Sequence, residues 1–294
     1  MLPALLPQEP APVTQRDAAR AARFLFCNMA VLEDLFLALR LETDQVLSQK
    51  AYSKPYPLGR CREITLDVIT RLKPRLMRLD HPGLEALAAF LADGGTGRCV
   101  WGVLRDRYFQ TALQFGGLYV DVSNDTVTVS KPKVEILPMA QAGLEAVRGP
   151  EHFAAIAGAY WGTQIVANHA LPSLAPILPM IGLAAGSPPE LLSATHYMVG
   201  LFRRDRFVQA ETWLRQGPTP APEVIQAVRA YCPADLLAAS SEPSIEAALA
   251  ACRDARAKDV ASELEWCAAR VAEYQRIRVG APHRAFERNL SPSR

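Results

Sequence analysis

A change in hydrophobic period between residues 97 and 123 constrains the fold of this chain more than any other feature. On both sides apolar residues recur every three to four positions, as in amphipathic helices, but here they alternate with period two. The pair Gly116-Gly117 separates two alternating segments, which predicts a tight β-hairpin. A two-residue loop pairs Phe115 with Leu118 and brings Gln110 opposite Ser123. The alternation also predicts one face in the core and a polar face toward water.

The segments around this hairpin are predicted to be helical. Helical spacing runs from Thr14 to about Leu41, restarts at Cys61 and returns at 83–92, and a further strand is expected at 126–130. Beyond residue 140 the spacing indicates helices only, at 140–148, 150–169, 189–203, 204–216, 221–231, 243–257 and 258–278.

These elements predict an α+β fold that is mostly α-helical, with a small antiparallel β-meander at about 98–130 packed on a central helix. The expected organisation is an α+β domain over 1–139, which includes a helical N-terminal lobe. A helical C-terminal region over 140–280 and a disordered tail over 281–294 follow. The proline-rich residues 1–13 are expected to form an arm.

Composition excludes several classes of function. The 294 residues carry a net charge of only +2, which argues against dedicated nucleic-acid binding. No unbroken apolar run is long enough for a transmembrane segment, and the N-terminus lacks the pattern of a secretory signal. Six cysteines without CxxC spacing indicate reduced thiols and a cytoplasmic location. We expect neither a metal nor a cofactor, because ligand spacings, the P-loop pattern and GxGxxG are absent.

One short constellation carries the chemistry that this sequence offers. Cys61 follows Gly59-Arg60 at the predicted start of a helix, where the positive end of the helix dipole favours a thiolate. The positive charges of Arg60 and Arg62 act in the same direction. A thiolate is the nucleophilic form of cysteine, and it needs a general base nearby.

Residues 55–130 resemble the papain-like superfold, and more closely its transglutaminase-like branch. The resemblance rests on Gly59-Arg60-Cys61 before a helix and on Leu118-Tyr119-Val120-Asp121 along a strand. It implies that Cys61 is a nucleophile and that Asp121 orients a histidine. The strand that should begin with this histidine carries Gln110 instead, and an amide cannot act as a general base. Either His81 or a histidine of the C-terminal helices supplies the base, or the site is degenerate.

Two functions therefore remain open. The preferred hypothesis is a non-catalytic protein-binding or assembly protein, a degenerate relative of that superfold, whose partner is another protein or a second copy of the chain. The alternative is a thiol-dependent acyl-transfer or amide-processing enzyme with Cys61 as nucleophile, assisted by Asp121 and Gln110. Simple packing of Cys61 is the competing structural explanation. Two basic clusters fit acidic partners, phosphates or solvated helix faces. They comprise Arg71, Lys73, Arg75 and Arg78, and Arg203, Arg204 and Arg206.

Overall fold

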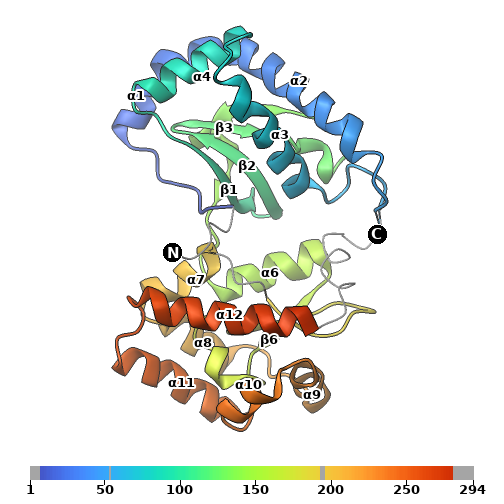
Figure 1. Cartoon of the computed structure of the whole chain (residues 1–294), viewed down its shortest axis with the longest axis vertical. Coiled ribbons are helices and arrows are strands. Elements are labelled where there is room, and N and C mark those ends of the chain that lie inside the picture. Colours follow the sequence, from blue (N-terminus) through green and yellow to red (C-terminus); the bar gives the residue numbers. More distant parts are fainter. Residues whose placement is uncertain (1–6, 53, 193–195, 281–294) are drawn as a thin grey trace. The chain divides into compact units, whose positions relative to one another are not determined.

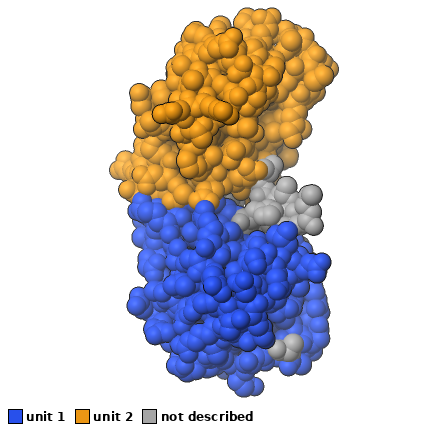
Figure 2. Space-filling view, turned by 90° about the vertical axis from the view of Figure 1, so that its left-hand side faces the viewer, with its two compact units in different colours: residues 1–6, 147–294 blue, residues 7–146 orange. Residues whose placement is uncertain are grey.

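The computed structural model describes residues 7–52, 54–192 and 196–280 (Figure 1). The described chain forms two compact units, which are named in chain order: the first unit, residues 7–146, is orange in Figure 2 (its unit 2), and the second unit, residues 147–280, is blue (its unit 1). With 52% helix and 14% strand, the α+β, mostly helical class predicted from the sequence is confirmed. The expected division falls at residue 139, whereas the first unit extends to residue 146 because β5 adds to its sheet.

Four α-helices build the N-terminal part of the first unit. They are α1 (Gln15–Phe24), α2 (Met29–Leu47), α3 (Cys61–Arg75) and α4 (Pro82–Ala92), with a short 3-10 turn, η1 (Phe26–Asn28), between the first two. Thr14 caps α1 in a capping box with Asp17, which satisfies backbone N–H groups that the first turn leaves free. The continuous helical spacing from residue 14 is thus divided at η1. The start of α3 at Cys61 agrees with the sequence pattern.

A five-stranded antiparallel sheet lies beside these helices in the order β4-β3-β2-β1-β5 (Figure 1). Its strands are β1 (Gly97–Leu104), β2 (Tyr108–Phe115), β3 (Leu118–Asp121), β4 (Glu135–Pro138) and β5 (Leu144–Glu145). Phe115 pairs with Leu118 across the glycine turn, so the predicted hairpin register is confirmed. Helix α3 packs on β2, as expected for the central helix.

Two details of the predicted sheet are wrong. The strand expected at 126–130 is absent from the described chain; instead a 3-10 turn, η2 (Asn124–Thr126), leads to a fourth strand at 135–138. The cause is local, because the Thr126 hydroxyl donates to the Ser123 carbonyl and turns the backbone there. The polar hairpin face does not meet water either: Gln110, Gln114 and Asp121 are all buried.

The described part of the N-terminal arm, residues 7–13, contacts the sheet through Gln8 and Ala11. Gln8 forms a parallel bridge beside Val100, where its N–H donates to the Cys99 carbonyl and its carbonyl accepts from the Trp101 N–H, both at 2.8 Å. Further along, the carboxamide of Gln114 bonds the backbone N–H and carbonyl of Ala11. The arm therefore satisfies one of the buried polar side chains of the hairpin.

The second unit combines helices with a small sheet that the sequence pattern missed. The helices are α6 (Pro150–Trp161), α7 (His196–Arg204), α8 (Val208–Gln216), α9 (Pro222–Ala230), α10 (Ala234–Ala239), α11 (Ile245–Ala257) and α12 (Leu264–Gly280). A short helix, α5 (Met139–Ala142), precedes them in the first unit, and η3 (Pro172–Leu174) is a 3-10 turn. Strands β6 (Gln164–Ala167), β7 (Met180–Leu183) and β8 (Glu190–Leu191) form an antiparallel sheet.

The helix expected over 150–169 is therefore wrong in its second half. It ends at Trp161 because Gly162 adopts a left-handed conformation, with φ at 63°, which terminates the helix. The predicted tail, 281–294, lies outside the described residues. Within the described ranges, no helix is both long and apolar enough to cross a bilayer.

Candidate functional site

Cys61 occupies the first position of α3, directly above β2. The N–H of Gly59 donates to the Thr126 carbonyl at 2.9 Å, which anchors the chain just before the helix. The sulfur of Cys61 lies 3.9 Å from the Oγ1 atom of Thr111. One turn further along α3, the Thr65 hydroxyl donates to the Thr111 carbonyl at 3.2 Å. These contacts fix the thiol against the middle of β2.

The surroundings of Cys61 oppose thiolate formation. Burial raises the pKa of the thiol to about 11, and the negative charges of Glu63 and Asp121 add to this. Arg60 does not offset the effect, because its guanidinium pairs with Glu63 at 2.9 Å and stacks over the ring of Tyr52 at 4.2 Å. The lowered pKa expected from the helix N-terminus is therefore not observed, since the cost of removing the thiolate from water is larger.

Asp121 and Gln110 form a buried polar cluster with Tyr119 and Ser123. The Asp121 carboxylate accepts hydrogen bonds from Gln110 Nε2 at 2.7 Å, Tyr119 Oη at 3.1 Å, and Ser123 N and Oγ at 2.8 and 3.0 Å. Gln110 Nε2 also contacts Ser123 Oγ at 3.1 Å, as the predicted register requires. Burial raises the pKa of Asp121 to about 6, and the four hydrogen bonds only partly counter that effect.

The strand β2 separates the thiol from this carboxylate. Gln110 and Thr111 are successive residues of β2, so their side chains point to opposite faces of the sheet. Cys61 contacts Thr111 on one face, whereas Asp121 bonds Gln110 on the other. The structure thus brings Asp121 and Gln110 together and places Cys61 across the sheet from them. Their catalytic roles stay predictions.

Two of the histidines considered as bases, His81 and His169, are engaged elsewhere. His81 caps α4 by accepting from the Gly83 N–H, and its Nε2 lies 3.2 Å from Asp34. His169, in the second unit, is buried and its Nε2 lies 2.8 Å from the Leu214 carbonyl. Among the residues that the structure describes, no hydrogen bond joins Cys61 to a histidine.

The sequence pattern did not single out Arg40, a buried arginine of the first unit. Arg40 on α2 has no exposed surface, and it forms a bidentate pair with Asp125 at 2.7 and 3.0 Å. Its Nε donates to Asp44 at 2.7 Å and its Nη1 to the Val122 carbonyl at 2.9 Å. This network ties α2 to the turn after β3. The sequence does carry a signal, because Arg40 follows Phe36 by four positions on the buried face of α2.

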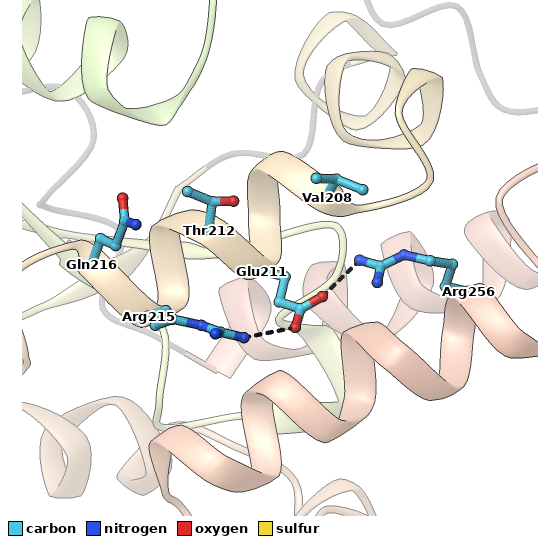
Figure 3. Close-up of a pocket in the computed structure, with 6 residues that line it drawn as sticks. All are labelled: Val208, Glu211, Thr212, Arg215, Gln216 and Arg256. Atoms are coloured by element: carbon cyan, nitrogen blue, oxygen red, sulfur yellow. Dashed lines mark hydrogen bonds and ion pairs between the residues drawn. The ribbon is translucent and has the colours of Figure 1, made fainter.

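A second group of charged residues lines a pocket between α8 and α11 (Figure 3). The pocket has a volume of about 270 Å³ and is lined by Val208, Glu211, Thr212, Arg215, Gln216 and Arg256. Arg215 and Arg256 both bond the carboxylate of Glu211. The basic cluster at 203–206 pointed to this stretch of sequence, but the arginines of the pocket come from α8 and α11.

Three arginines of the predicted basic clusters form ion pairs. Arg71 lies 2.6 Å from Asp67, and Arg75 lies 2.6 Å from Glu42 on the neighbouring helix α2. Arg206 pairs with Asp259 at 3.1 Å. These partners favour the interpretation of solvated, ion-paired helix faces.

Comparison with known proteins leaves this picture unchanged. No family model, curated protein or solved structure matches the chain. The likeness to the transglutaminase-like branch stays a prediction. In the described residues no group of histidine, cysteine and carboxylate side chains is arranged to hold a metal ion.

Proposed function

We propose that the protein is a non-catalytic binding or assembly protein, in which a degenerate cysteine-enzyme scaffold serves as a structural unit. One observation carries this proposal: β2 lies between Cys61 and the Asp121–Gln110 pair. A nucleophile and its base must lie within hydrogen-bond reach, and the base must be oriented by a third group on the same side. The partner of Cys61 is the hydroxyl of Thr111, which does not accept a proton at neutral pH.

Surface chemistry in the first unit supports binding to another protein or to a second copy. Leu37 and Leu41 are exposed one turn apart on α2, and Met77 and Leu79 are exposed just after α3. The contact of His81 with Asp34 brings the end of the loop between α3 and α4 close to the part of α2 that carries Leu37 and Leu41. Neighbouring exposed apolar side chains are typical of protein interfaces. All six cysteines are unpaired, which supports a reducing, cytoplasmic setting.

Alkylation kinetics test whether Cys61 is an activated thiol. At pH 8 a thiol with a pKa of about 11 is ionised roughly 200-fold less than an ordinary thiol with a pKa near 8.5. Iodoacetamide should therefore label the exposed Cys27 much faster than Cys61, as measured by peptide mass spectrometry. Cys27→Ser and Cys61→Ser assign the two signals. Labelling of Cys61 as fast as Cys27 contradicts the proposal.

The alternative, a thiol-dependent acyl-transfer enzyme, keeps one observation in its favour. Cys61 begins a helix and touches the same strand that carries Gln110, as the resemblance implies. This function needs a histidine from outside the contacts described above, and it predicts fast labelling of Cys61.

Light scattering and pull-down test the preferred function, with Leu41→Ser as the control variant for the exposed apolar surface. A strictly monomeric protein that captures no partner contradicts the preferred function.

A further inference from the structure

Two arginines that line the pocket between α8 and α11, Arg215 and Arg256, share the carboxylate of Glu211 with a third, Arg253, from outside the lining. Glu211 Oε1 lies 3.0 Å from both Arg215 Nη2 and Arg253 Nε, and Oε2 lies 2.7 Å from Arg256 Nη2. Burial raises the pKa of Glu211, but hydrogen bonds from Arg256 and Arg253 outweigh it, so the pKa falls below its ordinary value. Glu211 is therefore ionised at neutral pH and keeps the guanidinium groups close together.

The carboxylate does not neutralise the arginines. Three guanidinium groups and one carboxylate leave a net charge of +2 at the pocket. Two neighbouring ion pairs, Arg206 with Asp259 and Lys258 with Asp254, are each neutral. A ligand that matches this charge carries about two negative charges on one compact group.

The remaining donors suit such a group. Among the described residues, Arg215 donates only through Nη2 and Arg253 only through Nε, so each keeps further N–H groups for a ligand. Thr212 and Gln216 lie one turn apart on α8 and add a neutral hydroxyl and a carboxamide to the lining (Figure 3). Planar guanidinium groups bind phosphate oxygens in pairs, which an ammonium group cannot do.

The size of the pocket limits what is attached to the anionic group. Ligand pockets usually measure about 300–1,000 Å³, and this one has about 270 Å³. A phosphoryl group with a small organic substituent fits that space, whereas a dinucleotide does not. The exposed Val208 offers the only apolar side chain of the lining.

We propose that the pocket between α8 and α11 binds the phosphate monoester group of a small phosphorylated molecule through Arg215, Arg253 and Arg256. The phosphate dianion takes the N–H groups that Glu211 leaves unused. This site lies within residues 147–280 and does not depend on the role of Cys61.

Calorimetric titration of the full chain at low ionic strength tests the site. The probes are inorganic phosphate, AMP and O-phosphoserine, with acetate as the singly charged control. Phosphate and at least one ester should bind saturably, more weakly at pH 5 than at pH 8 because the second phosphate pKa is near 6. The ester that binds more tightly, AMP or O-phosphoserine, shows whether the phosphate group belongs to a nucleotide or to a phosphorylated amino acid.

Two arginine variants separate a built site from general charge attraction. Within the part of the chain that the structure describes, Arg215 bonds only Glu211, so Arg215→Gln should fold and weaken phosphate binding about tenfold. Arg16→Gln removes the same charge from an exposed position on α1 and should leave the affinity within about twofold. The proposal is overturned if no phosphate probe saturates, if acetate binds as tightly as phosphate, or if both variants weaken binding equally.

Discussion

Replacing Arg40 by methionine tests whether the buried ion network holds the first unit together. The methionine keeps most of the apolar stem but removes the guanidinium, which has no exposed surface and bonds both Asp125 and Asp44. Asp125 is then a buried carboxylate whose nearest cation is Lys133 at 3.6 Å. Removing one partner of a buried pair costs about 3–5 kcal/mol, mostly because the other charge stays buried.

Hydrogen exchange followed by mass spectrometry measures this loss in the full chain, because it resolves peptides of β2 and β3 from those of the second unit. Arg75→Met is the matched control: its pair with Glu42 has side chains about one third exposed, so we expect a loss of about 0–1 kcal/mol. Adding Asp125→Asn to Arg40→Met should restore part of the stability. Equal losses in the two single variants would refute the reasoning.

Asp121 and two glycines give the remaining predictions. The folded pKa of Asp121, about 6, lies above its unfolded value, so its favourable contribution is complete below about pH 3.8 and is lost as the pH rises through 6. The free energy of unfolding of the wild type relative to Asp121→Asn should fall by about 3 kcal/mol between pH 3.5 and 7.5 in urea titrations; a flat difference contradicts the raised pKa. Gly102→Ala places a Cβ against the carbonyl oxygen of Glu145 and should destabilise the first unit by about 1–3 kcal/mol. Gly158→Ala in α6 meets open space and should stabilise the second unit by about 0.5–1 kcal/mol. Thermal shifts of the same sign in Gly102→Ala and Gly158→Ala would contradict these two predictions.

The parts of the fold that were predictable from sequence depend on local chemistry. Two glycines set the length of the hairpin loop, and period-two alternation then fixed Phe115 opposite Leu118 and Gln110 opposite Ser123. The strands of the second sheet have at most four residues, too few for a periodic signal, so β6 and β8 fell within stretches predicted as helix and β7 was not predicted.

The candidate site shows where local patterns fail. Cys61 does begin a helix, but burial raises the pKa of its thiol and outweighs the hydrogen bonds with Thr111, 50 positions away, which lower it. Alternation predicted a solvated polar face for the hairpin. Its polar residues are instead buried, and the Gln110 side-chain N–H donates to the Asp121 carboxylate. The pocket between α8 and α11 joins residues about 40 positions apart, which no spacing rule could connect.

The position of the N-terminal arm has a consequence for how the first unit behaves in crowded solution. β5 pairs with β1 only at Val103 and Leu104, so without Gln8 the stretch from Cys99 to Trp101 would expose unpaired backbone groups. Such an open sheet edge recruits strands from other molecules and leads to aggregation. Gln8 fills the gap, and it is followed within four residues by Pro10 and Pro12, which have no N–H to donate. The arm thereby closes the edge of the sheet with a segment that is itself a poor template for further strands.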